Sequence, residues 1–408
     1  MKKLFPFTMM FLMFFVSCNL FDSGDKQAAP QPFPENMEME AKSIIASNNG
    51  FGFDLFQKLY QDDSPENMMI SPSSISLALA MTYNGAEGET KTAFENTLHL
   101  TDLSRDQINS IYKNLQHYLK RTDSKVQMNI ANSVWSKQGT TVEEEFKNNI
   151  NVFYDAEFRV EDFSNPATLD AINHWVEQNT EGKIQNILDE IPADAFMYLI
   201  NAIYFKGEWT NRFETKDTYT GKFTDEEGDI TQVNYMTAEM DINYQENDLF
   251  TAIELPYGNK DYSMIILLPH EDKKLADIVV QLNDSNWNKW MNSFSALGLN
   301  VHLPKFKFGY KEELSDVLTQ LGMDIPFSDA ANFSGISKGV PLKISKVIHQ
   351  SFIEVNEKGT EAAAATVVGM ELTSPGPSNA IHIDKPFFFA IKEKQTNSIV
   401  FMGNVKKP

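Results

Sequence analysis

Residues 357–366 read Glu-Lys-Gly-Thr-Glu-Ala-Ala-Ala-Ala-Thr, and Val367, Val368 and Gly369 follow directly. Helix propensity alone would place the four alanines in a helix. From position 360 onward, however, every second residue is small or apolar, and the positions between them include Glu361 and Glu371. The residues that share the first parity are Thr360, Ala362, Ala364, Thr366, Val368, Met370 and Leu372. This period of two predicts a strand with one buried face, whose small side chains could enter a crowded sheet.

A segment of a different composition follows this pattern. Residues 373–379 read Thr-Ser-Pro-Gly-Pro-Ser-Asn. Proline, glycine and small polar residues of this kind are typical of exposed turns. The sequence therefore places an exposed loop directly after the alternating segment.

The rest of the chain divides into a helical first half and a second half rich in strands. Apolar residues recur with helical spacing at 49–60 and at 169–188, where the helix is expected to end near Gly182. Residues 71–74 (Ser-Pro-Ser-Ser) are typical of a cap for the apolar run 75–81. Strand-like runs cover 198–205, 251–255, 262–268, 301–308, 343–355, 386–392 and 399–405. Helices early and antiparallel-looking strands late predict an α+β fold.

Composition excludes several classes of function. The 408 residues carry 56 Asp and Glu against 35 Lys and Arg, a formal net charge of −21, which argues against binding to nucleic acid. The sequence has no phosphate-binding loop, no His-Glu-x-x-His motif and no pair of cysteines for zinc, and its seven histidines are scattered singly. No motif therefore supports an enzyme, and we expect no metal and no cofactor.

The N-terminus has the order of a secretory signal. Lys2 and Lys3 precede an apolar run over 4–16, and Ser17 precedes Cys18, the only cysteine. Residues 15–18 (Phe-Val-Ser-Cys) resemble a bacterial lipobox, in which cleavage leaves the cysteine at the N-terminus with a diacylglycerol attached. The alternative is an ordinary signal peptide in which Cys18 is incidental.

These features predict three parts: a lipoprotein signal peptide at 1–17, a flexible tether at 18–42 and one domain at 43–408. Residues 19–40 are polar and rich in proline, with Pro30, Pro32 and Pro34, and this composition is typical of a solvated tether. With lipid on Cys18 the protein would be anchored to a membrane of the cell envelope, extracytoplasmic, at the outer membrane or cell surface.

The domain resembles the serpin family. Residues 357–366 match the hinge of inhibitory serpins, and other family motifs follow in the family's order along the chain. They are Asn-Met-Met-Ile-Ser-Pro-Ser-Ser-Ile at 67–75, Asn-Ala-Ile-Tyr-Phe-Lys-Gly-Glu-Trp at 201–209, Leu-Pro-Lys-Phe at 303–306, Asp-Lys-Pro-Phe-Phe-Phe at 384–389 and Phe-Met-Gly at 401–403. The resemblance implies helices packed on three β-sheets, with an exposed reactive-centre loop.

It also implies a function, a suicide-substrate inhibitor of serine proteases that acts as a monomer. The target would attack the loop and form a covalent acyl-enzyme, which insertion of the cut loop into the main sheet would trap. The hinge would consist of Glu357, Gly359, Thr360, Glu361, Ala362, Ala363, Ala364, Ala365 and Thr366. A polar shutter beneath the parting strands would consist of Ser71, Ser74, Asn201 and His349. The alternative is a non-inhibitory serpin that acts as a binding or chaperone-like protein.

The same resemblance predicts the scissile bond. In inhibitory serpins it usually lies sixteen residues beyond the hinge glutamate, which from Glu357 falls between Thr373 and Ser374. Counting back from the Lys-Pro-Phe motif at 385–387 gives a slightly later bond, and Leu372 and Met370 remain alternatives. No Lys or Arg lies between positions 358 and 385, so a trypsin-like pocket would find no partner for its carboxylate. The expected targets are elastase-, subtilisin- or chymotrypsin-like.

Overall fold

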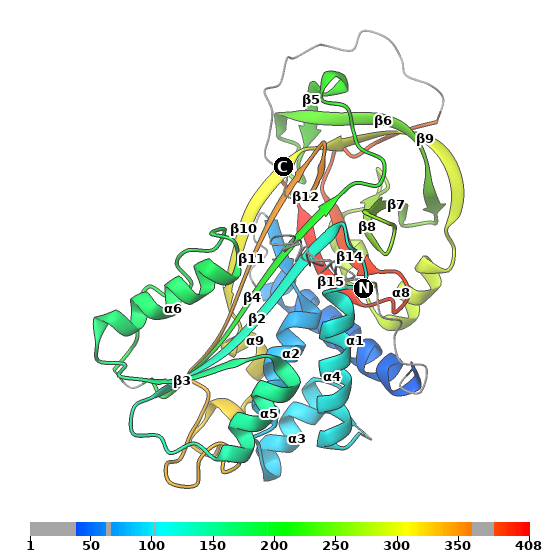
Figure 1. Cartoon of the computed structure of the whole chain (residues 1–408). Coiled ribbons are helices and arrows are strands. Elements are labelled where there is room, and N and C mark those ends of the chain that lie inside the picture. The colour runs from blue at the N-terminus through cyan, green and yellow to red at the C-terminus, as the bar shows by residue number, and fades with distance from the viewer. Residues whose placement is uncertain (1–37, 63–66, 102, 194, 361–378) are drawn as a thin grey trace, which may run out of the picture.

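The computed structural model describes residues 38–62, 67–101, 103–193, 195–360 and 379–408, and Figure 1 shows helices gathered beside two large sheets. Local signals explain several helix starts. Ser71 caps α2 by accepting a hydrogen bond from the backbone N–H of Ser74, and Pro72 occupies the first turn. Ser104 and Gln107 form a capping box at the start of α4. The helices are α1 Glu38–Asp62, α2 Pro72–Tyr83, α3 Gly88–Thr97, α4 Arg105–Leu119, α5 Glu144–Tyr154, α6 Pro166–Asn179, α7 Leu275–Val279, α8 Asp284–Met291 and α9 Ser315–Leu318, with short turns η2 Thr215–Asp217, η3 Thr319–Met323 and η4 Ile325–Phe327.

A six-stranded sheet forms one side of the molecule, with the strand order β10-β11-β12-β4-β2-β3. Its long central strands are β4 and β11, which run parallel to one another, and the very short β12 lies between their upper ends (Figure 1). The strands are β2 Val126–Lys137, β3 Glu157–Glu161, β4 Met197–Glu208, β10 Phe306–Glu313, β11 Lys346–Asn356 and β12 Gly359–Thr360.

A nine-stranded sheet forms the other side, with the order β1-β15-β14-β8-β7-β6-β9-β13 and β5 paired to β6. The strands are β1 Asn67–Ile70, β5 Tyr219–Thr224, β6 Ile230–Glu246, β7 Phe250–Tyr257, β8 Tyr262–Pro269, β9 Ser295–Pro304, β13 Ala380–His382, β14 Phe387–Glu393 and β15 Ile399–Val405.

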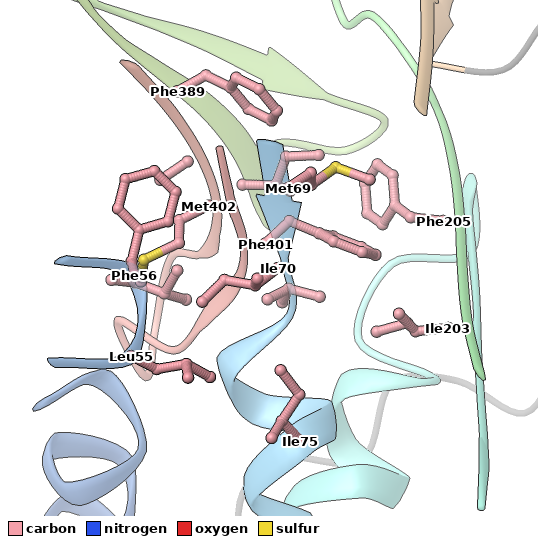
Figure 2. Packing of buried hydrophobic residues seen from close by; sticks show 14 of the residues in the cluster. Leu55, Phe56, Met69, Ile70, Ile75, Ile203, Phe205, Phe389, Phe401 and Met402 are labelled. Atoms are coloured by element: carbon pink, nitrogen blue, oxygen red, sulfur yellow. The ribbon is translucent and has the colours of Figure 1, made fainter. Parts of the chain in front are cut away.

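The main core fills the space between the two sheets and is closed by α1 and α2. Figure 2 shows Ile203 and Phe205 of β4 facing Phe401 of β15, whereas Met402 of β15 lies beside Phe56 of α1, and Ile75 of α2 lies below them. Every residue of α2 is buried, as expected for a helix that lies beneath a sheet. A second, smaller cluster packs α6 against the opposite face of β4 and β11, so the six-stranded sheet is covered on both faces there.

The α+β class is confirmed, and among the described residues hydrogen bonds link the strands into two continuous sheets where the resemblance implies three. The cause is the length of β6, whose 17 residues pair with β5 over 230–235, with β9 over 235–244 and with β7 over 243–246. Strands that a shorter β6 would leave in separate sheets are therefore connected.

Several predicted boundaries differ from the structure. The predicted strand 301–308 is two strands in different sheets, β9 and β10, which meet at Lys305. The helix predicted within 169–188, with its end near Gly182, ends at Asn179, before the left-handed residues Glu181 and Gly182. Helix α1 begins at Glu38, so residues 38–42 are helical and do not belong to the tether predicted at 18–42.

Candidate functional site

The six-stranded sheet is open in its upper half between β11 and β4. In the lower half the two strands pair directly, from Lys346 opposite Tyr198 to Gln350 opposite Ala202. Among the described strands, no ladder joins residues 351–354 to 203–206; there β11 pairs only with β10, and β4 only with β2. A strand edge with unpaired N–H and C=O groups accepts another strand. The sheet thus presents two facing edges at one place.

The first two residues of a further strand already occupy the top of this opening. Thr360 pairs with Val355 of β11 on one side and with Gly207 of β4 on the other. The pairs are antiparallel on both sides, and Thr360 is only 2% exposed. The opening between β11 and β4 therefore has the width of one strand.

Gly359 is in this place because no other residue fits. Its φ of +151° is rarely adopted by residues with a side chain, and a Cβ there would lie 2.0 Å from the carbonyl oxygen of Gly207. Glycine therefore allows the chain to turn from β11 into the opening.

The turn before Gly359 is fixed by Trp209 and by the buried Glu357. The Trp209 indole N–H donates to the carbonyl of Asn356 at 2.9 Å, and its backbone N–H donates to the carbonyl of Lys358 at 2.8 Å. The Glu357 carboxylate accepts from Lys305 Nζ and from the Thr218 hydroxyl. Burial alone would raise the pKa of Glu357, but the hydrogen bonds from its own backbone, Lys305 and Thr218 together hold that pKa below its usual range.

The lower end of the opening rests on a buried polar cluster. Asn201 of β4 lies opposite His349 of β11, and its Oδ1 is 3.2 Å from His349 Nδ1. The Asn201 amide nitrogen reaches the Ser74 carbonyl at 3.1 Å, the Ser74 hydroxyl, and Asn132 Oδ1 at 2.8 Å. The structure thus brings together all four predicted shutter residues, since Ser71 donates its backbone N–H to His349 Nε2 at 3.3 Å.

These contacts fix the protonation of His349. Because Nε2 accepts a hydrogen bond, the proton of the neutral ring is on Nδ1 and is donated to Asn201. Burial lowers the pKa of His349 to about 3, so the imidazole is neutral at physiological pH. A second ring proton would point at the Ser71 N–H, which is already a donor.

The comparisons with known proteins agree with this geometry. The family profile described as Serpin (serine protease inhibitor) matches residues 46–408. This chain is a serpin. A serpin-like protein of Methanosarcina mazei is 35% identical over 376 residues, covering 90% of this chain and 87% of the relative. Human serpin B4 is 33% identical, covering 90% of this chain and 100% of that protein. The structure of the thermophilic serpin tengpin in its native state is 34% identical with a TM-score of 0.80, covering 89% of this chain and 94% of tengpin.

Serpins are generally protease inhibitors rather than catalysts, although some are not inhibitory. Other features of this serpin that could suggest different chemistry lack the necessary context. Gly335-Ile336-Ser337-Lys338-Gly339 has the Gly-x-Ser-x-Gly spacing of a nucleophile elbow, but neither a strand before it nor a helix after it is present. Among the described residues, no three His, Cys, Asp or Glu side chains are placed to hold a metal ion. No described helix has both the length and the apolar character to cross a membrane.

Part of the predicted site lies outside the described residues. This holds for the lipidation site Cys18, for the hinge residues Glu361, Ala362, Ala363, Ala364, Ala365 and Thr366, and for the reactive-bond candidates Met370, Leu372, Thr373 and Ser374. These assignments remain predictions. The described part of the hinge consists of Glu357, Gly359 and Thr360. Together they form the turn after β11 and the first strand pairs at the top of the opening.

Four residues of the site were not predicted from the sequence: Asn132, Thr218, Tyr257 and Lys305. Each is far along the chain from its partner; Tyr257, for example, contacts a residue 103 positions away. No local pattern marks such a contact. Asn132 lies on β2, a strand that the sequence analysis did not predict.

Proposed function

We propose that this serpin is a suicide-substrate inhibitor of serine proteases. The observation that carries the proposal is the opening between β11 and β4, with Gly359 and Thr360 already paired at its top. The residues after Thr360 have the alternating small side chains that a strand between two others requires. Four alanines in this segment present no charge and no bulk to the opening.

The proposed reaction begins as ordinary proteolysis. The protease serine oxygen attacks the carbonyl of the scissile residue, the peptide bond breaks, and the new amine leaves with its proton. The upstream half of the loop then remains esterified to the protease. Because that half continues from Thr360, it can enter the opening as a strand and carry the protease with it.

The length of the inserted segment and the free energy of its insertion are large enough to disable the protease. Fourteen residues from Thr360 to Thr373 extend about 46 Å at roughly 3.3 Å each. About ten ladder hydrogen bonds at ~0.5–1.5 kcal/mol each, with the burial of Val368, Met370 and Leu372, give on the order of 10 kcal/mol. This is comparable with the whole stability of a protease domain, ~5–15 kcal/mol. Hydrolysis of the ester needs an intact triad and oxyanion hole, so distortion stops it.

The side chains near the proposed bond favour an apolar pocket in the target. With Thr373 at the cleaved position the elastase-like class is favoured, and with Leu372 or Met370 the chymotrypsin-like class is favoured; subtilisin-like pockets suit all three. Trypsin-like proteases should be poor targets because no basic residue is present in the segment.

The test is a denaturing gel of the protein after incubation with elastase, subtilisin, chymotrypsin and trypsin. A trapped acyl-enzyme survives boiling in detergent as a band at the summed mass, and mass spectrometry of the released fragment identifies the bond. A non-inhibitory binding or chaperone-like serpin would be cut without forming that band with any protease of the panel. A band with trypsin alone and a cut outside 370–375 would overturn the target class.

We also propose that Cys18 carries a lipid that attaches this serpin to the cell envelope, on the side where foreign or envelope proteases are met. The support is the sequence at 15–18 and the charged and apolar segments before it. Wild-type protein should partition into the detergent phase, and Cys18→Ser should move it to the aqueous phase. Unchanged partitioning of Cys18→Ser would refute lipidation.

A further inference from the structure

Tyr257 connects the nine-stranded sheet to the hinge in the six-stranded sheet. It is the last residue of β7, whereas Thr360 is the last described residue of β12. The Tyr257 hydroxyl lies 2.6 Å from the Thr360 hydroxyl, and both residues are buried, at 0% and 2% exposure. Each hydroxyl thus satisfies the other where exposure to water is almost nil.

The position of the Tyr257 hydroxyl is fixed by the rings around it. The Trp209 indole stacks on the Tyr257 ring with centroids 4.4 Å apart and 12° between the planes. The Phe205 ring meets it edge-on at 5.3 Å. Trp209 is itself held by the Asn356 carbonyl, one residue before the hinge glutamate. The acceptor for Thr360 therefore stands in a set place before the loop inserts.

This contact distinguishes Thr360 from its neighbours along the chain. A strand that slips by one residue exchanges its two faces, which would bring Gly359 or Glu361 to the same place. Glycine has no hydroxyl for Tyr257, and a glutamate would be buried without a cation. Of these registers, only the observed one gives the tyrosine a hydrogen-bond partner without burying a charge.

We propose that Tyr257 is a positioning residue for loop insertion: its hydroxyl holds Thr360 in the opening before cleavage and sets the register in which the new strand begins. The effect of Tyr257 on how firmly Thr360 is held in the opening can be measured without a protease. Its consequence for trapping rests on the proposed inhibitory function.

The central test is hydrogen–deuterium exchange of residues 356–360 in the uncleaved, full-length protein. Tyr257→Phe leaves the Thr360 hydroxyl unpaired, and Thr360→Val, which has nearly the same shape, leaves the Tyr257 hydroxyl unpaired. Each should speed exchange of the hinge amides on the order of tenfold, because an unpaired buried hydroxyl favours the state in which water reaches it. The double variant leaves neither group unpaired, and its exchange should return to within about threefold of wild type.

Two further variants keep the test decisive. Tyr235→Phe removes another buried tyrosine hydroxyl in the same sheet, which donates to the Lys222 carbonyl at 2.9 Å, and it should leave hinge exchange unchanged. Thr360→Ser keeps the hydroxyl and should retain hinge protection even if Tyr257→Phe fails to fold. The proposal is overturned if the double variant exchanges as fast as the single variants, if the single variants match wild type, or if Tyr235→Phe accelerates the hinge equally.

Protease trapping gives the second readout. With a protease that wild type traps, Tyr257→Phe and Thr360→Val should each raise the number of inhibitor molecules cut per protease trapped, and the double variant should reverse the rise. If wild type traps no protease, the inhibitory proposal fails while the exchange result still decides the role of Tyr257. If both single variants trap protease normally although their hinge amides exchange faster, the contact between Tyr257 and Thr360 does not determine whether insertion traps the protease.

Discussion

Gly359 and Thr360 occupy a space that is bounded by the backbones of β11 and β4. The Gly207 carbonyl lies where a Cβ of residue 359 would be, and the Thr360 side chain points to a buried tyrosine. Both residues are therefore restricted in size and in charge. We expect these positions to accept substitutions that keep the side chains small and retain the one hydroxyl, and to reject larger or charged side chains.

Thr360→Arg should convert the proposed inhibitor into a substrate. A guanidinium at a position of 2% exposure would be buried against the Tyr257 hydroxyl, and burial of such a charge costs several kcal/mol. Cleavage does not require insertion and should continue at the wild-type rate, whereas insertion should slow. We expect at least a tenfold smaller fraction of protease in the covalent band.

Lys358→Arg is the matched control, because Lys358 is exposed and next to the hinge glycine. It should trap protease as well as wild type does. If Thr360→Arg traps equally well, insertion does not begin at residue 360.

The stability of the shutter should depend on pH through His349. Its pKa is about 3 in the folded protein, because of burial, against 6.5 in an unfolded chain. A lowered histidine pKa means that the unfolded state takes up a proton first, so stability is full above about pH 6.5 and falls as the pH drops towards 3. From pH 7 to pH 5 the loss from this residue is about 2 kcal/mol.

Urea unfolding of the native protein at pH 7 and pH 5 measures this loss. His349→Gln has no group that titrates there, so its pH dependence should be smaller than that of wild type by about this amount. An identical pH dependence in the two proteins would show that His349 is not the titrating group.

The part of the site that consists of adjacent residues could be predicted from the sequence. The hinge from Glu357 to Thr360 could be predicted because its glycine, threonine and alternating alanines form one continuous pattern. The partners that complete it, Lys305 with Glu357 and Tyr257 with Thr360, come from other strands. Their positions depend on how two sheets pack, and a single sequence carries no local signal for that.

Among the elements, β4 and β11 are the pair on which the site depends. Their upper halves lack a shared ladder in the described chain, and their lower halves are joined both by the ladder and by the Asn201–His349 hydrogen bond. Insertion of a strand along the whole sheet requires that this lower contact opens. The small cluster beneath α6, which includes Tyr198, must then also move.

Asn201→Ala should weaken this closure. The change removes the partner of His349 Nδ1 and one partner each of Ser74 and Asn132, all of them buried. We expect a loss of about 2–4 kcal/mol, because buried groups left unpaired cost more than a simple lost contact. The measurement is the urea midpoint of the native protein.

Asn243→Ala is the comparison, since it removes an exposed hydrogen bond from β6 to Glu254. It should cost less than about 1 kcal/mol. Equal losses for the two variants would mean that the shutter does not hold β4 and β11 together.

Strand prediction succeeded where a strand is buried and bounded by turns, as for β8 at 262–269 against a predicted 262–268. It failed at 301–308 because the alternation continues through Pro304 and Lys305 while the chain passes from one sheet to the other. It also missed β6, whose buried and exposed positions do not alternate regularly. Because β6 pairs with three other strands, it has no single face exposed to solvent. Its sequence therefore lacks the alternation of polar and apolar residues that would mark a strand.

The molecule has a packed apolar core, but its six-stranded sheet has an opening between β11 and β4. The two sheets share a continuous apolar interior around β4 and β15, shown in Figure 2. The opening between β11 and β4 lies above that interior, so a strand placed there would gain ladder partners on both sides and a buried face. We infer that the uncut chain is not in its most stable arrangement and that a kinetic barrier preserves it.

Cleavage of the loop should therefore stabilise the protein. After a cut between residues 370 and 375, insertion from Thr360 should raise resistance to urea by on the order of 10 kcal/mol, from the ladder hydrogen bonds and the buried side chains. The thermal midpoint should rise in parallel, and N-terminal sequencing of the released fragment confirms where the chain was cut. A cleaved protein that melts at or below the temperature of the intact one would contradict insertion.

The opening between β11 and β4 has room for one strand, and the chain has one segment with the composition to fill it. Once the segment is in place the edges are gone, and nothing in the chain can expose them again without unfolding the sheet. Under the proposed function, protection is thus limited by the number of copies present and not by a turnover rate. A cell that makes this protein would lose one copy with every protease that is trapped, and synthesis of new chains would decide how long its defence lasts.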